Sequence, residues 1–185
     1  MQDSKKPSAV SRFIRDIDQL KQESDPQKLT QSVRGLQKNY EAALTAKSDD
    51  ENASVKQALV DLTHKMLINS IETKDITLMK DMAFSVMSNL TILSLVDDKD
   101  PIQRGIHSEI PKEDQDKQDI NFKRFETLAN SFRYASTALD KAAQQMEANA
   151  EQVNAVKMVA SKYKHLSDNI TVKVDQQRTY AELRR

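Results

Sequence analysis

Cysteine and tryptophan are both absent from the 185-residue sequence. Without cysteine the chain forms no disulfide, has no thiolate nucleophile and offers no cysteine ligand to a metal. This composition suits the cytosol, and it suits equally an exported protein that does not depend on disulfides. Residues 1–20 contain no apolar core of a secretory signal. The sequence therefore predicts no recognisable signal there and leaves both compartments open.

Glycine and proline are scarce, with two glycines and four prolines in the whole chain. Both residues interrupt helices, and so few of them indicate an all-helical protein. The two glycines, Gly35 and Gly105, are too far apart in sequence to form one phosphate-binding loop. The glycine-rich nucleotide-binding motifs are therefore excluded.

The chain has no excess of charge of either sign, since 28 basic residues balance 28 acidic ones. A general attraction to nucleic acid or to an anionic membrane is therefore not expected. The segment from Lys157 onward is basic, but only Tyr163 and Tyr180 could stack on bases, so nucleic-acid binding is unfavoured. The uncharged stretch 83–96 is too short to span a membrane and is predicted to be a buried helix.

No constellation of residues predicts catalysis, a metal site or a cofactor. A di-iron bundle needs Glu-x-x-His motifs, and the sequence has none. His64 follows Asp61 by about one helical turn and is interpreted as a surface histidine. Asp97, Asp98 and Asp100 resemble half of a calcium loop that lacks its glycine and its last glutamate, so they are expected to be solvated. We therefore predict a protein that is not an enzyme and holds no cofactor.

Apolar residues recur at intervals of three and four along most of the chain, which predicts a series of amphipathic helices. Asp25 followed by Pro26 is typical of a helix start. The pattern does not decide whether 55–96 is one helix or two, because 72–75 can break the helix or continue it. The segment 170–185 alternates locally like a strand, but a single strand would have no partner, so we predict a helix. The other expected helices cover about 10–20, 29–43, 55–69, 76–96 and 125–163.

A single domain is expected from residue 8 to residue 185, because this length fits one elongated bundle. Residues 1–7 are predicted to be disordered. The segment 97–119 contains two of the four prolines and carries a net negative charge, so it is predicted to be a mobile acidic loop.

The segment 125–163 contains no glycine and no proline, and it repeats apolar or small residues in heptads. If it formed one continuous helix, it would be roughly 58 Å long. A stripe this narrow buries against one or two neighbouring helices. Asn149 is a polar residue within the stripe, and it can either fix the register of packing or mark a break. The stripe is expected to pack on earlier helices of the same chain, or to extend beyond them and bind a partner.

The sequence as a whole predicts an all-α fold, an elongated antiparallel bundle of about four to five helices with a long coiled-coil-like C-terminal helix. We expect a non-enzymatic protein that acts through contacts with a protein partner or by self-association, as a scaffold, adaptor, assembly subunit or exported interaction factor. Its candidate interface consists of residues expected to be exposed on the last helix: Tyr163, Ile170, Val174 and Tyr180.

Two alternatives remain open from the sequence. The first is a sensory or ligand-binding bundle that holds an apolar small molecule. Its candidate pocket is a cluster of apolar residues in the middle of the chain: Met79, Met82, Ala83, Phe84 and Met87. The second is an exported protein that acts on membranes through 76–96.

Overall fold

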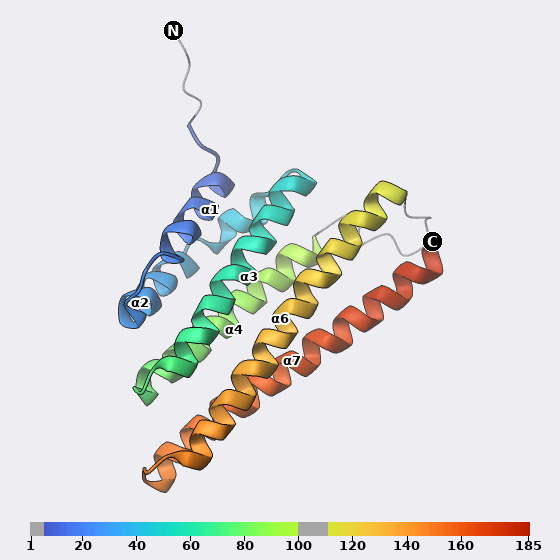
Figure 1. The fold of residues 1–185 in the computed structure, drawn as a ribbon. Helices are drawn as coiled ribbons and strands as arrows, with labels where there is room; N and C mark the ends of the chain where they lie inside the picture. Colours follow the sequence, from blue (N-terminus) through green and yellow to red (C-terminus); the bar gives the residue numbers. More distant parts are fainter. Residues whose placement is uncertain (1–5, 100–110) are drawn as a thin grey trace.

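The computed structural model describes residues 6–99 and 111–185. All regular structure among these residues is helical, so the predicted all-α bundle is confirmed (Figure 1). The elements are α1 (Ala9–Leu20), α2 (Pro26–Gln37), the 3-10 helix η1 (Tyr40–Thr45), α3 (Asp49–Glu72), α4 (Ile76–Asp98), α6 (Lys112–Gln145) and α7 (Ala150–Arg184).

Polar side chains cap several of these helices at their starts. The Asp25 carboxylate accepts hydrogen bonds from the backbone N–H groups of Gln27 and Lys28, at 2.9 and 3.3 Å, as its position before a proline predicted. Asp75 accepts from the N–H of Leu78 at 3.1 Å and starts α4. The segment 55–96 is therefore divided between two helices, α3 and α4, which meet at a short turn.

The second predicted helix is shorter than expected, because the α-helical conformation stops at Gln37. Tyr40 and Ala43 lie in η1 instead and are both buried. The ring of Tyr40 packs edge-on against Phe13 at 6.0 Å, and its hydroxyl donates a hydrogen bond to the side chain of buried Asn89. Through Tyr40 the 3-10 helix packs against both α1 and α4.

The helix expected over 125–163 is divided in two, because α6 ends at Gln145 and α7 begins at Ala150; of the two roles left open for Asn149, the break is the one observed. Asn149 marks the break: its side chain accepts a hydrogen bond from the N–H of Gln152 at 2.9 Å and caps α7. The chain then reverses, so the heptad stripe belongs to two helices that pack on each other. The long C-terminal helix of the prediction is therefore a hairpin of two long helices (Figure 1).

The predicted acidic loop 97–119 is shorter at both ends. Helix α4 continues to Asp98, and α6 starts at Lys112 with Glu113 and Asp114 in its first turn, where negative charge favours a helix. The rest of the predicted loop, 100–110, lies outside the described residues, as do residues 1–5.

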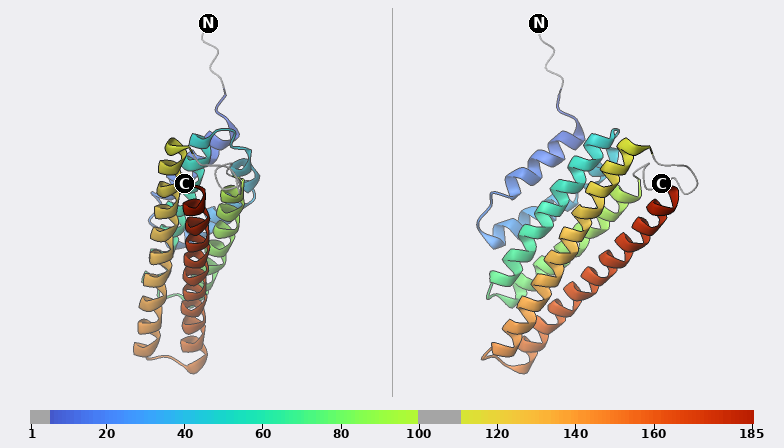
Figure 2. Two further views of the ribbon diagram at one scale, coloured as in Figure 1. Left: turned by 90° about the vertical axis from the view of Figure 1, so that its right-hand side faces the viewer. Right: turned by 45° about the vertical axis from the view of Figure 1, so that its right-hand side comes forward.

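The helices are arranged as two hairpins that lie side by side, α3 with α4 and α6 with α7 (Figures 1 and 2). Helix α3 packs on α4 and also on α6, while α1 covers α3 and α2 covers α4. Helices α4 and α7 run in the same direction but contact each other less than these pairs do. The edge between α4 and α7 is therefore the open edge of the bundle.

Candidate functional site

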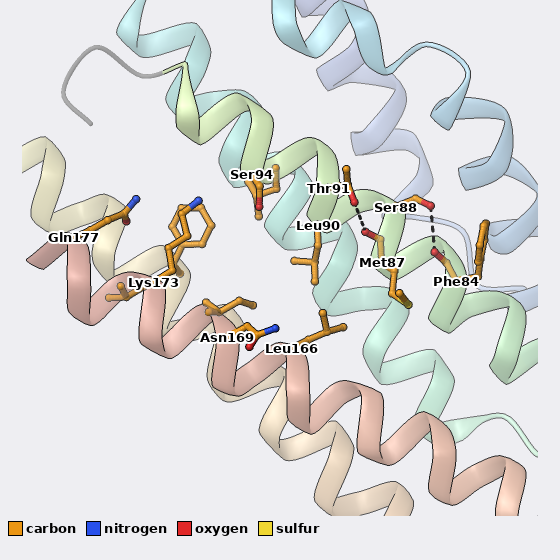
Figure 3. A pocket seen from close by; sticks show the side chains of 14 residues that line it. Phe84, Met87, Ser88, Leu90, Thr91, Ser94, Leu166, Asn169, Lys173 and Gln177 are labelled. Atoms are coloured by element: carbon orange, nitrogen blue, oxygen red, sulfur yellow. Dashed lines mark hydrogen bonds between the residues drawn. The ribbon is translucent and has the colours of Figure 1, made fainter. Parts of the chain in front are cut away.

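A groove of about 450 Å³ occupies this open edge between α4 and α7. Leu90 from α4 and Leu166 from α7 point into the space between the two helices (Figure 3). Lys173 is the only residue with a formal charge among the described residues that line the groove. The lining consists of Phe84, Met87, Ser88, Leu90, Thr91, Leu93, Ser94, Phe125, Leu166, Asn169, Ile170, Lys173, Val174 and Gln177.

The α4 wall of the groove continues onto an exposed and uncharged helix face. No charged residue occurs between Asp81 and Asp97. Even so, Phe84 is 65% exposed, Leu95 is 45% exposed and Met87 is 38% exposed. The sequence predicted that this stretch would be buried on all sides, and that expectation is wrong for one face. Helices of a bundle normally place charged residues toward water, so α4 has the composition of a covered helix and the position of a surface helix.

Two hydroxyl groups on this face already have hydrogen-bond partners within α4. The Ser88 hydroxyl donates to the backbone oxygen of Phe84 at 3.2 Å, and the Thr91 hydroxyl donates to the backbone oxygen of Met87 at 3.1 Å (Figure 3). A buried hydroxyl donor without a partner would cost about 1–3 kcal/mol. Covering this face with another apolar surface would leave neither hydroxyl donor unsatisfied.

A buried ion pair between α3 and α4 lies next to Lys173 of the groove. The Lys56 ammonium lies 2.8 Å from the Asp97 carboxylate, and both side chains are almost inaccessible to solvent, at 1% and 0%. Asn121 donates to the same carboxylate at 2.9 Å. Asp97 was expected to be solvated and is instead one of the most buried residues, because Lys56 supplies the opposite charge.

Helix α7 also contributes to this polar cluster. The Lys173 ammonium lies 3.5 Å from Asp97 and 3.5 Å from Asp98, and 5.9 Å from the centre of the Phe125 ring. Burial by itself raises the pKa of the Asp97 carboxyl, but the charge and hydrogen bond of Lys56, with help from Asn121 and Lys173, lower that pKa below its usual value. The carboxylate therefore stays ionised, and it links α4 to α7 where the groove ends.

The four candidate interface residues on the last helix have different environments. Tyr163 and Val174 are buried, so their predicted exposure is wrong. The Tyr163 hydroxyl donates to Ser70 at 3.1 Å, its ring packs edge-on against Phe132 at 5.7 Å, and burial raises its pKa to about 12. The reason is that the apolar stripe of α7 packs mainly on α6. Ile170 is half-buried and lines the groove, as does Val174, whereas Tyr180 is exposed.

The five residues of the alternative pocket also separate into two groups. Met79, Met82 and Ala83 are buried in the core and do not line the groove. Phe84 and Met87 do line the groove and form part of its α4 wall. Two residues of the predicted interface, Ile170 and Val174, therefore line the same groove as two residues of the predicted pocket, Phe84 and Met87.

Sequence reasoning missed the contributions of Leu90, Ser94, Leu166 and Lys173 to this groove. The signal that could have found the α4 residues is the uncharged run 83–96, because its apolar residues cover more of the helix surface than one buried face requires. No comparable signal identifies Leu166 or Lys173, since both fit an ordinary amphipathic helix.

A second cleft between α3 and α6 is polar and carries His64. His64 is exposed, as predicted, and its Nδ1 lies 2.9 Å from the hydroxyl of Ser131. That hydroxyl donates to the backbone oxygen of Thr127 at 3.0 Å. The arrangement is a hydrogen-bonded surface contact between two helices. Across the described part of the chain, no three histidine or acidic side chains are grouped closely enough to hold a metal ion.

Comparison of the chain with models of protein families, with curated proteins and with solved structures found no match. Within residues 6–99 and 111–185, none of the helices has the length and the apolar character needed to cross a membrane. The fold and the site define the chain as an all-α bundle with an apolar groove along one open edge.

Proposed function

We propose that this chain is a non-enzymatic helical protein that acts by binding another protein chain along the groove between α4 and α7. A scaffold, an adaptor, an assembly subunit and an exported interaction factor all work in this way. The observation that carries the proposal is the exposed α4 face, which has large apolar side chains and no charge between Asp81 and Asp97. Exposed apolar surface that is larger than isolated residues is typical of a protein interface.

The shape of this surface favours a helix as its occupant. Its α4 residues Phe84, Met87, Thr91 and Leu95 succeed one another at intervals of three and four, so they form one straight stripe. Leu166, Ile170 and Lys173 form a parallel stripe on α7. A groove between two helices with such spacing accepts the apolar face of a third helix.

An apolar small molecule is the second candidate occupant, favoured by the groove volume of about 450 Å³. Ligand pockets of proteins usually measure about 300–1,000 Å³ and are mostly apolar. A small molecule within the groove would not cover Leu95, which lies outside its lining, so this candidate explains less of the exposed surface. It predicts that a fatty acid or a similar apolar compound raises the melting temperature of the purified chain.

Site-specific photocrosslinking in the cells that naturally produce the chain tests the protein-binding proposal. A photoreactive phenylalanine analogue replaces Phe84 in one variant and Tyr134 on α6 in a control. The two positions are matched, since Phe84 is 65% exposed and Tyr134 is 64% exposed. We expect a protein adduct from position 84 that is absent from position 134 and is lost when Leu95→Asp is added. Equal adducts from both positions, or none from position 84, would overturn the proposal.

A further inference from the structure

The exposed face of α4 is almost symmetric about its own midpoint. Its centre lies near the buried Asn89, where Met87 and Thr91 are the exposed residues on either side and Ser88 is half-buried. Large apolar residues follow on both sides, with Phe84 toward one end and Leu95 toward the other.

Opposite charges stand at the two ends of the same face. Lys80 precedes Asn89 by nine positions, and Asp98 follows it by nine. Both residues are exposed. Asp98 also lies 3.5 Å from Lys173 of its own chain, but its side chain keeps 64% of its exposure. Rotating this face by half a turn about its midpoint would therefore place Lys80 on Asp98 and Phe84 close to Leu95, with Met87 opposite Thr91 between them.

We infer that the chain which binds at this edge is a second copy of this chain, in a symmetric dimer in which the exposed faces of the two α4 helices pack antiparallel. An interface of this kind must be complementary to itself, because each copy presents the same surface to the other. Lys80 of each copy then meets Asp98 of the other, and Phe84 meets Leu95. This inference rests on the proposed function and names its partner.

The exposed face of α4 would be covered by the same face of the other copy. The two-fold axis would pass between the two α4 helices, and the grooves would lie beside this contact. The paired stretch from Lys80 to Asp98 would be roughly 28 Å long, at 1.5 Å per residue. Met87 and Thr91 would lie opposite each other near its centre, and the hydroxyls of Ser88 and Thr91 already have acceptors within α4.

The first experiment measures the mass of the purified full chain by light scattering over a range of concentrations. We expect twice the 21.0 kDa of a single chain. Phe84→Asp should raise the dissociation constant of the dimer by about a hundredfold or more, because each copy would bury a charge against apolar residues. Tyr134→Asp on α6 is the matched control and should leave the dimer intact. Circular dichroism of both variants should be unchanged, since both side chains are exposed.

The second experiment tests the antiparallel pairing by reversing the charges. Lys80→Asp and Asp98→Lys, each alone, replace two attractive contacts by two repulsive ones and should weaken the dimer roughly tenfold. An equimolar mixture of these two variants should recover the original affinity as a mixed dimer, because every contact between unlike copies is again between lysine and aspartate. A mixture that associates no better than either variant would overturn the inference.

A monomer at all concentrations would also overturn the inference. If photocrosslinking at position 84 still gave an adduct with a different protein, the proposed function would survive and only its partner would change. A monomer together with no adduct at position 84 would reject both.

Discussion

The buried pair of Lys56 and Asp97 gives the sharpest test of how the described helices are held together. We consider Asp97→Asn, which keeps the size of the side chain and removes its charge. The variant leaves the Lys56 ammonium, which is 1% exposed, facing a neutral amide. Removing one partner of a buried ion pair typically costs about 3–5 kcal/mol, because the remaining charge has lost its compensation.

The neighbouring residue provides the control. Asp98 is also a carboxylate at the end of α4 and also faces Lys173, but it is 64% exposed. Exposed ion pairs contribute about 0–1 kcal/mol, so Asp98→Asn should have little effect on the free energy of unfolding. The two substituted residues are neighbours in sequence. They differ mainly in that the carboxylate of Asp97 is buried and that of Asp98 is exposed.

Urea denaturation followed by circular dichroism measures the difference. A domain has about 5–15 kcal/mol of stability in total, so Asp97→Asn should remove a large fraction of it and move the urea midpoint clearly downward. The double variant Lys56→Met/Asp97→Leu should regain most of the loss, because apolar residues can replace a buried ion pair without leaving a charge unpaired. The reasoning would be refuted if Asp97→Asn and Asp98→Asn had free energies of unfolding within about 1 kcal/mol of each other.

Two further predictions concern acid and a helix cap. The folded-state pKa of Asp97 is lowered, so the stability that its carboxylate contributes is complete above the usual aspartate pKa of about 3.9. That stability is lost as the pH falls through the lowered value. Urea denaturation measured between neutral pH and acid should show the loss, and Lys56→Met/Asp97→Leu should show less of it. Asn149→Ala removes the side-chain acceptor for the N–H of Gln152 and should cost about 1 kcal/mol in urea denaturation; replacement of the exposed, non-capping Asn154 by alanine should cost less, and equal costs would contradict the capping role.

Much of the fold could be predicted from local sequence. The paucity of glycine and proline indicated helices, and Asp25 before Pro26 located the start of α2. The pattern failed at the reversal of the chain between α6 and α7. The heptad spacing of apolar residues continues through Met146, Asn149 and Val153, and an asparagine at such a position occurs both inside coiled coils and at helix starts. Local sequence therefore did not distinguish a polar residue in a continuous helix from a cap after a turn.

The site was harder to predict, because burial depends on which helices become neighbours. Tyr163 and Tyr180 both lie on α7, yet the first is in the core and the second is exposed. Asp97 shows the same limitation for charge: its buried partner Lys56 is distant in sequence, and only the packing of α3 on α4 brings the two together. Periodicity locates an apolar stripe on a helix, but the tertiary arrangement decides what that stripe contacts.

The polar cluster and the apolar groove are parts of one arrangement. Asp97 on α4 is bound by Lys56 of α3, Asn121 of α6 and Lys173 of α7, so all four long helices meet at one carboxylate. A charge that is stable only when its partners are in place tolerates few alternative packings, whereas apolar contacts alone would let α4 slide or rotate against α7. We therefore interpret the cluster as the contact that fixes the spacing of α4 and α7 at one end. The α4 wall from Phe84 to Ser94 can then stay apart from α7, so that the two helices present a groove of defined width. On this interpretation the charged contacts of Asp97 orient α4 at one end of the helix. The uncharged exposed face between Asp81 and Asp97 then remains available for binding.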